Sequence, residues 1–409
     1  MEDGTAPALR LTVFPLSLFL FASRPIGAAM RRLTIDPRPN WQKRVEEHGL
    51  YYHTIRNEPY WDESACYQFT NYEVDRIEEA TQTLHDMCME LVEEVIDKRM
   101  FGLFFIPKDF EEYVIRSWEL REPSVYGRFD LVFDGVGPPK MLEYNADTPT
   151  ALVEAAVAQW VWLKDTDERG DQFNSIHEHL IDAWKAVLKR DPGPIHFAAL
   201  SKQDSPEDYI TAEYMRDTAI QAGAKTDFID ITDIGWDSPR RCFVDRTGFP
   251  IHRCFKLYPW EWMVNPEEEF SRYIRGAAVK WVEPAWKMIL SCKSILPLLY
   301  ERHPNSPFLL PASFDPIQDG SYVKKPIHAR EGANIEVVIN GRLALSTDGP
   351  YKGPCVYQSL ATQLKPHDGR YPVIGSWVVN GEACGMGIRE DASLVTGNTS
   401  RFVPHQMVG

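Results

Sequence analysis

Two short segments read YGRFDLVF at positions 126–133 and KMLEYNAD at positions 140–147. Polar and apolar residues alternate in both segments, which is the period of a half-buried β-strand. The residues between them, DGVGPP, are typical of a turn. The two segments are therefore predicted to form a β-hairpin.

The polar side chains of this hairpin form the first candidate site. Because side chains two positions apart on a strand share a face, Arg128 and Asp130 point one way, and Glu143 and Asn145 also share a face. If the strand register brings the two faces together, a cation, two carboxylates and an amide oxygen meet above the sheet. Such oxygen ligands suit Mg²⁺, which completes its shell with nucleotide phosphates. The alternative is an ordinary solvated strand face.

Size and composition bound the class of protein. The chain has 409 residues, of which 44% are hydrophobic, and this predicts a globular protein of two or three lobes. Its formal net charge of -15 argues against nucleic-acid binding through a broad basic surface. The seven cysteines are odd in number and contain no C-x-x-C pair, which favours reduced thiols in a cytoplasmic protein.

The first 29 residues differ from the rest and are expected to be an extension or leader. The apolar run over 9–22 is too short to span a bilayer comfortably, so no stable membrane insertion is expected. Glu2 and Asp3 stand where a signal peptide needs positive charge, and Met30 opens an ordinary protein start. An extended or mis-assigned N-terminus is favoured, and export through 1–29 is the alternative.

Several further elements follow from periodicity and capping. An apolar stripe predicts a helix over 71–98. Thr148 and Pro149 are expected to be the N-cap and first residue of a helix that continues over 151–163, beside the hairpin. Its free N–H groups would then face an anion. A strand–helix–strand pattern over 194–231 predicts a parallel βαβ unit.

The second half of the chain predicts a mostly antiparallel α+β region. Segments 242–244 and 251–257 are expected to pair as a hairpin, and 287–300 to form one helix. Strands are expected at 321–326 and 354–360, with Asn-Gly turns at 340–341 and 380–381. The predicted domain ranges are 1–29 (extension or leader), 30–190 (helical region plus metal-site hairpin), 191–275 (βαβ substrate lobe) and 276–409 (nucleotide-binding region).

Seven motifs, taken in order, resemble the glutathionylspermidine synthase family, in its ATP-grasp synthetase domain. They are YGRFD (126–130), LEYNAD (142–147), EPAWK (283–287), YVKKPI (322–327), REGAN (330–334), IGSWV (374–378) and GIRED (387–391). The resemblance runs over 30–409 and implies a stand-alone synthetase-like member, without a counterpart of the amidase domain of bifunctional members. It implies a mixed α/β and α+β fold: an ATP-grasp fold with a preceding βαβ, pre-ATP-grasp-like lobe.

The resemblance also implies a reaction. Such enzymes use ATP and Mg²⁺ to phosphorylate a carboxylate, and an amine then attacks the acyl phosphate. Phosphoryl transfer depends mainly on charge neutralisation and alignment, which suits the charged residues of these motifs. The expected partners are a peptide-like carboxylate and a small amine, with glutathione and a polyamine as the family's substrates. A nucleotide-binding regulatory protein without catalytic activity is the alternative.

The resemblance assigns roles to individual residues. The expected Mg²⁺ ligands are Asp130, Glu143 and Asn145, and the expected catalytic arginines are Arg128 and Arg389. The expected ATP-binding residues are Lys293, Lys325, Arg330, Gly332, Gln358 and Leu360. The expected substrate-binding residues are Thr148, Thr150, Glu207 and Asp208.

Each of these residues also has a structural alternative. Lys325 could be an edge charge, Lys293 a solvated helix residue, and Gly332 a turn glycine. Arg389 could take part in surface ion pairing, which contributes little. Acidic residues at 207–208 could simply favour a helix N-terminus.

Overall fold

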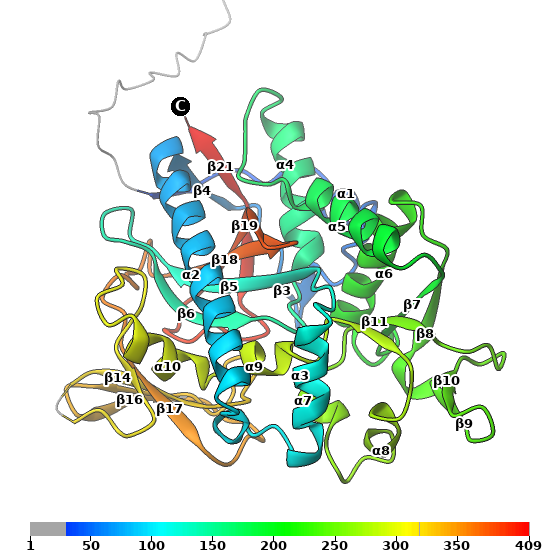
Figure 1. Cartoon of the computed structure of the whole chain (residues 1–409). Coiled ribbons are helices and arrows are strands. Elements are labelled where there is room, and N and C mark those ends of the chain that lie inside the picture. The colour runs from blue at the N-terminus through cyan, green and yellow to red at the C-terminus, as the bar shows by residue number, and fades with distance from the viewer. Residues whose placement is uncertain (1–29, 319, 409) are drawn as a thin grey trace, which may run out of the picture.

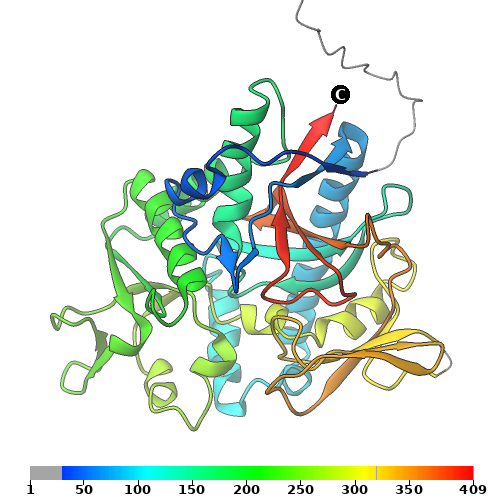
Figure 2. The same cartoon turned by 180° about the vertical axis from the view of Figure 1, so that it is seen from behind.

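The structure of the chain is a computed structural model that describes residues 30–318 and 320–408. The predicted leader over 1–29, and the export alternative that depends on it, lie outside these residues. Within the described ranges there are three sheets of four or five strands, with helices packed between and beside them, and the sheet that contains β14 (Tyr322–Pro326), β16 (Arg342–Ser346) and β17 (Cys355–Ser359) lies at the edge of the molecule (Figures 1 and 2). This agrees with the expected mixed α/β and α+β class.

The central sheet has the strand order β20-β19-β18-β5-β6, and all neighbours are antiparallel. Its strands are β5 (Tyr126–Val132), β6 (Lys140–Asn145), β18 (Tyr371–Val379), β19 (Glu382–Asp391) and β20 (Arg401–Val403). The predicted hairpin is therefore confirmed as β5 and β6, and so is the strand pair around 379–382. Strands from the predicted ranges 30–190 and 276–409 share this sheet, while the domain boundaries themselves remain a prediction.

The expectation of a half-buried hairpin is wrong for β5, in which every residue is buried. Helix α2 (Asn71–Asp97) packs against β18 and β19 on one face of the sheet, and η3 (Glu154–Ala158) and α5 (Ile176–Arg190) pack against these strands as well. Helix α2 confirms the predicted helix, and its capping box joins Thr70 to Glu73. Strand β5 lies inside the sheet between β18 and β6, its Phe129 and Leu131 belong to the hydrophobic core, and its Arg128 and Asp130 form a buried ion pair, so it is buried even though its sequence alternates.

The helix expected after the hairpin begins later than predicted. Ala151 has a φ of 62°, so the chain is not helical at Thr148 and Pro149. The π-helical turn η3 leads into α4 (Gln159–Thr166). The Thr148 hydroxyl accepts a hydrogen bond from Arg330 instead of capping a helix. A tertiary contact has therefore replaced the expected cap.

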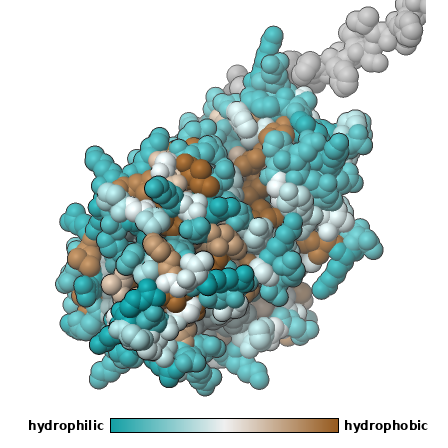
Figure 3. Space-filling view, turned by 90° about the vertical axis from the view of Figure 1, so that its right-hand side faces the viewer, coloured by the Kyte–Doolittle hydropathy of each residue, from teal (hydrophilic) through white to brown (hydrophobic). Residues whose placement is uncertain are grey.

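The parallel sheet has the order β12-β11-β7-β8 and confirms the predicted βαβ unit. Its elements are β7 (Ile195–Ala199), α6 (Pro206–Gln221), β8 (Thr226–Asp230), β11 (Arg253–Lys256) and β12 (Lys280–Val282). On the side formed by α5, α6 and β8, hydrophilic residues cover most of the surface and hydrophobic residues lie in smaller patches between them (Figure 3). Such scatter is ordinary for a protein surface.

The hairpin predicted from 242–244 and 251–257 forms only at its turn, and its two segments enter different sheets. Strand β10 (Cys242–Val244) pairs with β9 (Gly235–Asp237), and β11 enters the parallel sheet. Next to the turn, Val244 forms an isolated antiparallel bridge with Pro250, and the backbone N–H of Ile251 donates to the carbonyl of Phe243 at 2.8 Å. The Asp245 carboxylate accepts backbone N–H groups of the tight turn that follows it, which accounts for the turn signal.

The outer sheet has the order β13-β17-β14-β15-β16 and is antiparallel. Its strands are β13 (Ala312–Ser313), β14 (Tyr322–Pro326), β15 (Glu336–Ile339), β16 (Arg342–Ser346) and β17 (Cys355–Ser359). The predicted strands at 321–326 and 354–360 are confirmed. The Asn340-Gly341 turn is confirmed too, with φ of 51° and 73° at its two residues.

The single helix predicted over 287–300 is wrong. It is divided into α9 (Lys287–Ser291) and α10 (Ile295–Arg302). At the break, the backbone N–H of Lys293 donates to the carbonyl of Ile327, at 3.0 Å, instead of to a helical carbonyl. The break releases Lys293 from a regular helix, and nothing in the local sequence signals this.

A three-stranded sheet joins the two ends of the described chain: β1 (Arg31–Thr34), β4 (Ala65–Thr70) and β21 (His405–Val408). The remaining short elements are α1 (Trp41–Glu46), β2 (Thr54–Ile55), β3 (Glu58–Pro59), η1 (Phe101–Phe104), η2 (Lys108–Phe110), α3 (Glu111–Glu119), η4 (Ile231–Asp233), α7 (Trp260–Met263) and α8 (Ser271–Ile274). Among the described residues, no helix has both the length and the apolar character needed to cross a membrane.

Candidate active site

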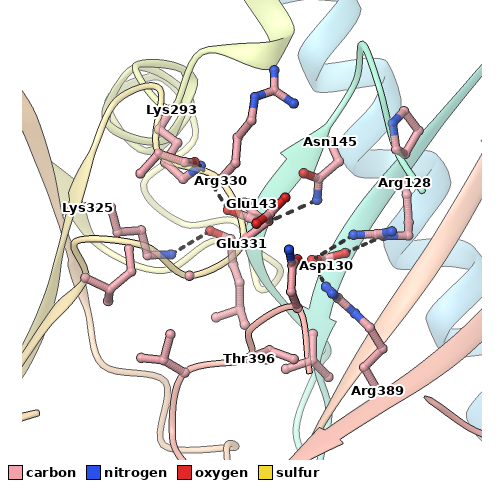
Figure 4. Close-up of a pocket in the computed structure, with 18 of the residues that line it drawn as sticks. Arg128, Asp130, Glu143, Asn145, Lys293, Lys325, Arg330, Glu331, Arg389 and Thr396 are labelled. Carbon is pink, nitrogen blue, oxygen red and sulfur yellow. Dashed lines mark hydrogen bonds and ion pairs between the residues drawn. The ribbon is translucent and has the colours of Figure 1, made fainter. Parts of the chain in front are cut away.

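One cavity of about 280 Å³ brings the predicted site residues together. It opens between the central sheet, the outer sheet and the N-terminal end of α6. All of the predicted residues line it: Arg128, Asp130, Glu143, Asn145, Thr148, Thr150, Glu207, Asp208, Lys293, Lys325, Arg330, Gly332, Gln358, Leu360 and Arg389. In Figure 4, Arg128 and Arg389 point toward Asp130, and Lys293 points toward Glu143.

Two arginines hold the Asp130 carboxylate at one end of the cavity. Arg128 Nε donates to Asp130 Oδ1 at 2.7 Å, and Arg389 Nη2 donates to Asp130 Oδ2 at 3.0 Å. Arg128 also donates to the carbonyl of Thr150 at 2.6 Å. Between the two arginine-bearing strands lies Gly375 of β18, where an added Cβ would come within 2.7 Å of the Arg128 side chain. The glycine therefore leaves the space that Arg128 fills.

The strand register brings the polar faces of the hairpin together. Asp130 lies opposite Glu143, and Arg128 lies opposite Asn145. Opposite residues in an antiparallel pair share a face, so the predicted meeting of these groups is observed. Lys293 Nζ lies 3.1 Å from a Glu143 oxygen, and Asn145 donates to the other oxygen at 3.3 Å.

Electrostatics keep Glu143 ionised. Burial alone would raise the pKa of its carboxyl group, but the ammonium groups of Lys293 and Lys325 outweigh burial and lower that pKa to about 2. Glu143 is therefore a carboxylate at any pH near neutrality. The permanent negative charge of Glu143 suits a residue that binds cations.

Lys325 is buried, not an edge charge, and is 8% exposed. Its Nζ donates to Gln358 Oε1 at 2.8 Å and to the carbonyl of Leu142 at 3.0 Å. Gln358 in turn donates to the carbonyl of Met141 at 3.0 Å, which fixes its amide. Burial lowers the pKa of Lys325 to about 8, although Glu143 opposes this shift.

The segment 328–334 forms one wall of the cavity. Arg330 donates to Glu261 at 2.6 Å and to the Thr148 hydroxyl at 2.8 Å. Gly332 has a φ of 69°, and an added Cβ would lie 2.5 Å from the carbonyl oxygen of Thr396. Glycine at position 332 therefore allows both the left-handed backbone conformation and the close approach of this segment to Thr396.

Glu207 and Asp208 line the cavity and also occupy the first turn of α6. Both sequence interpretations are therefore compatible with their position. Burial and the neighbouring charges of Glu207 and Glu331 raise the pKa of Asp208 to about 6, against its hydrogen bond with Ser205. This end of the cavity is acidic, whereas the end around Arg128 and Lys325 is basic.

The donor set for a metal consists of two carboxylates and one amide oxygen. Asp130, Glu143 and Asn145 provide them on adjacent strands, and hard oxygen donors of this kind fit Mg²⁺. Across 30–318 and 320–408, no three His, Cys, Asp or Glu side chains cluster as a metal site by themselves. The residues fit a metal that shares its shell with phosphate oxygens and water.

Sequence reasoning missed several residues in and around the cavity. Glu261, the partner of Arg330, lies in α7 and carries no local signal. Tyr60, which lines the cavity, comes from a segment that no motif marked. The buried pair of Lys256 and Asp147, 2.5 Å apart, ties the parallel sheet to the end of β6. Asp147 belongs to the LEYNAD motif, so its position alone could have drawn attention.

A mixed α/β protein with a cavity that is basic at one end and acidic at the other has the features of an enzyme that acts on charged small molecules. The family model described as glutathionylspermidine synthase preATP-grasp matches residues 32–408. The chain belongs to the glutathionylspermidine synthase family, and the predicted family membership is confirmed.

Three relatives support this membership. A Haemophilus influenzae protein assigned as an acid–amine ligase is 41% identical over 401 residues, which cover 93% of this chain and 100% of that protein. Trypanothione synthetase of Crithidia fasciculata is 28% identical over 350 residues, 78% of this chain and 53% of the relative. Bifunctional glutathionylspermidine synthetase/amidase of Escherichia coli is 27% identical over 382 residues, which cover 86% of this chain and 60% of that protein.

These comparisons confirm an enzyme of the carboxylate–amine ligase class, and ATP use follows from the family. The chain spans only 53% and 60% of the two longer relatives. Among solved structures, a glutathione synthetase-like effector from Globodera pallida in its apo form has a TM-score of 0.54 at 10% identity, covering 90% of this chain and 96% of that one. That likeness concerns the fold alone.

Proposed function

We propose that this ligase activates a carboxylate with ATP and Mg²⁺ to an acyl phosphate, which a small amine then converts to an amide. The proposal includes an ATP-grasp fold with a preceding βαβ lobe, divided near the predicted ranges 30–190, 191–275 and 276–409. It also includes a cytoplasmic location, which the seven free cysteines support.

The observation that carries the proposal is a local excess of positive charge in an acidic chain. Two carboxylates, Asp130 and Glu143, lie among four cations that distant segments contribute: Arg128, Lys293, Lys325 and Arg389. The net charge of the whole chain is -15. A cationic cavity floor in such a chain favours a polyanion, and a nucleotide triphosphate fits that requirement.

The chain's own residues would divide the work of phosphoryl transfer. Lys293 and Lys325 would bind phosphate oxygens, while Arg128, held by Asp130 and the carbonyl of Thr150, would orient the transferred group. Arg389 would neutralise charge on the acyl phosphate. Rigid positioning of cations is what this reaction requires of a protein.

Asp130, Glu143 and Asn145 would hold Mg²⁺, which when bound would neutralise charge on the phosphate oxygens. Gln358 and Leu360 would lie beside the adenine, and Arg330 and Gly332 would cover the phosphates. Because the relatives bear the names of glutathionylspermidine and trypanothione synthetases, glutathione and a polyamine are the first substrates to test. Thr148 and Thr150 would contact the peptide, and Glu207 and Asp208 the amine.

The test uses the purified full chain with ATP, Mg²⁺, a panel of peptides that includes glutathione, and a panel of amines that includes spermidine. ADP release should require both a carboxylate and an amine, and mass spectrometry should detect the amide. Arg389→Gln should abolish product formation. The matched variant Arg401→Gln, on the neighbouring strand and paired to Glu58 and Asp62, should retain it.

Tight ATP binding without substrate-stimulated ADP release, across both panels, would contradict the proposal. That result would favour the regulatory alternative. Equal loss of activity in Arg389→Gln and Arg401→Gln would also count against the assigned role of Arg389.

A further inference from the structure

A buried carboxylate that the mechanism above does not use lies behind the acidic end of the cavity. Glu154 begins the π-helical turn η3 and is 0% exposed. Its Oε1 accepts hydrogen bonds from two phenols: Tyr52 at 2.7 Å and Tyr60 at 2.8 Å. Its Oε2 has no hydrogen-bond partner among the described residues.

A buried acid that is only half-satisfied is costly to keep, and such groups concentrate at functional sites. Burial and the charge of Glu207 raise the pKa of Glu154 to about 7, although the bonds from Tyr52 and Tyr60 oppose this. A carboxyl group with such a pKa can exchange a proton near neutral pH. An ordinary structural carboxylate in an ion pair could not.

Tyr60 connects this acid to the cavity. Of the two tyrosines, Tyr60 lines the cavity and Tyr52 does not. Burial is the main cause that raises the pKa of the Tyr60 phenol, and the negative charges of Glu154 and Glu207 raise it further. The positive charge of Arg389 lowers this pKa. The phenol therefore lies within electrostatic reach of both the acidic end and the arginine assigned to the acyl phosphate.

The proposed reaction needs a proton acceptor at this place. A small amine is protonated at neutral pH, and an ammonium group has no lone pair with which to attack a carbonyl. The acidic residues Glu207 and Asp208 would hold the ammonium form by charge, which makes removal of a proton harder. A neighbouring acceptor is required before the nitrogen can act as a nucleophile.

We infer that Tyr60 and Glu154 form a proton relay that deprotonates the attacking amine. As the ammonium N–H bond breaks, its proton passes to Tyr60 Oη, and the phenolic proton of Tyr60 passes to Glu154 Oε1. The nitrogen then attacks the acyl carbon, and the C–O bond to the leaving phosphate breaks. The phosphate takes the second proton from nitrogen, so the amide is neutral and the atoms balance.

This relay rests on the proposed function, and it assigns separate tasks to the groups that face it. Tyr60 is the group that contacts the amine. Glu154 acts through Tyr60, and Tyr52 only helps to fix the position of its Oε1. The titratable and charged groups acting on the pair are Tyr52, Glu207 at the start of α6, and Arg389 of β19.

The experiment separates carboxylate activation from attack by a protonated amine. The full chain is assayed with ATP, Mg²⁺ and glutathione, and the nucleophile is either spermidine or hydroxylamine. Hydroxylamine is largely uncharged at neutral pH, so its attack needs no proton acceptor beforehand. Glu154→Gln and Tyr60→Phe should form the hydroxamate at close to the wild-type rate but lose about 10²-fold or more in spermidine ligation.

The pH profile gives a readout that a merely structural role would not change. In the wild type, spermidine ligation should fall as pH decreases through about 7, because Glu154 becomes protonated and can no longer accept a proton. In Glu154→Gln and Tyr60→Phe, spermidine ligation should not show this fall near pH 7. Its rate should instead increase as pH rises, because more of the amine is then uncharged. Tyr52→Phe loses a hydrogen bond to the same oxygen but not the link to the cavity, so its ratio of ligation to hydroxamate formation should fall much less than that of Tyr60→Phe.

Three results would overturn the inference. Loss of hydroxamate and amide to the same degree in Tyr60→Phe would mean that the residue supports the fold or carboxylate activation. Equal effects of Tyr52→Phe and Tyr60→Phe on the ratio would remove the special place of Tyr60. Failure of the wild type to form hydroxamate from any carboxylate would instead overturn the proposed function, and the relay with it.

Discussion

Lys324 and Lys325 are neighbours on β14 with opposite environments. Lys325 is buried against Gln358 in the cavity, whereas Lys324 reaches Glu336 on the adjacent strand at 3.0 Å. A hydrogen bond to Glu336 raises the pKa of Lys324, while burial lowers that of Lys325 to about 8. The alternation of a strand therefore separates a lysine that lines the cavity from a lysine in a surface ion pair.

This pair provides a matched test. Lys325→Met should reduce kcat/KM for ATP by roughly 10²-fold, because one preorganised charge on the phosphates is lost. Lys324→Met should change it little, since partly exposed ion pairs contribute little. Steady-state ADP release at varied ATP measures both, and equal losses in the two variants would contradict the account.

The lowered pKa of Lys325 also predicts a pH dependence. Above about pH 8 the side chain loses its charge, so kcat/KM for ATP should fall as pH rises. The unfolded chain keeps this proton up to pH 10.5, so stability contributed by Lys325 rises over the same interval. Activity should thus fall while the melting temperature does not, and Lys325→Arg, which stays charged, should lack the alkaline fall in activity.

At the scale of elements, two glycines with similar backbones have different tasks. Gly332 and Gly341 have φ of 69° and 73°, so a substitution strains both alike. An added Cβ at Gly332 would collide with the carbonyl of Thr396, whereas at Gly341 nothing lies within 4 Å. The first glycine allows two segments to close the cavity wall, and the second only turns a hairpin.

Alanine substitution separates strain from close approach. Backbone strain should cost both variants about 1 kcal/mol of unfolding free energy, and Gly332→Ala should lose more because its Cβ collides with the Thr396 carbonyl. Gly332→Ala should in addition raise the KM for ATP several-fold, because the segment 328–334 can no longer reach its place. Thermal melts and kinetics on the two variants check this, and an unchanged KM in Gly332→Ala would show that close approach has no role in binding.

Local sequence patterns predicted some of these elements and failed for others. The β5–β6 hairpin, α2 and the βαβ unit follow from periodicity and turn residues, which act within each segment. The break at Lys293 and the late start of the helix after Ala151 depend on contacts with Ile327 and Arg330, which are distant in sequence. No local pattern contains such contacts.

At the scale of the whole molecule, a buried ion pair joins two sheets. Lys256 of β11 and Asp147 after β6 are 0% and 1% exposed, and Asp147 also accepts the backbone N–H of Trp260 at 2.8 Å. Removal of one partner leaves an unpaired buried charge, which costs more than the pair gains. The pair therefore holds the parallel sheet against the central sheet. It thereby also fixes the position of one end of the cavity relative to the other.

Lys256→Met should lower the unfolding free energy by about 3–5 kcal/mol. Lys280→Met, which removes an exposed partner of Asp191, should lower it by less than about 1 kcal/mol. Denaturant unfolding followed by tryptophan fluorescence compares the two. Similar small losses would mean that Asp147 finds another partner.

The sequence motifs predicted part of the cavity directly, because five of the seven motifs contribute residues that line it. The predicted residues outside the motifs are Thr148, Thr150, Glu207, Asp208, Lys293, Gln358 and Leu360, and these also line the cavity. The motifs could not predict how the cavity is assembled. Strands β18 and β19 cross from the end of the chain to lie beside β5, and Glu154, Tyr60 and Glu261 enter from segments without a motif. Such residues are found only when the chain is folded.

The central claim is that a carboxylate becomes an acyl phosphate in this cavity. The direct measurement uses glutathione with ¹⁸O in its carboxylates, together with ATP, Mg²⁺ and spermidine, and analyses the released phosphate by mass spectrometry. The account predicts that one ¹⁸O passes from the carboxylate to the phosphate for each amide formed. Amide formation with unlabelled phosphate, or ADP release that does not depend on the carboxylate, would contradict it.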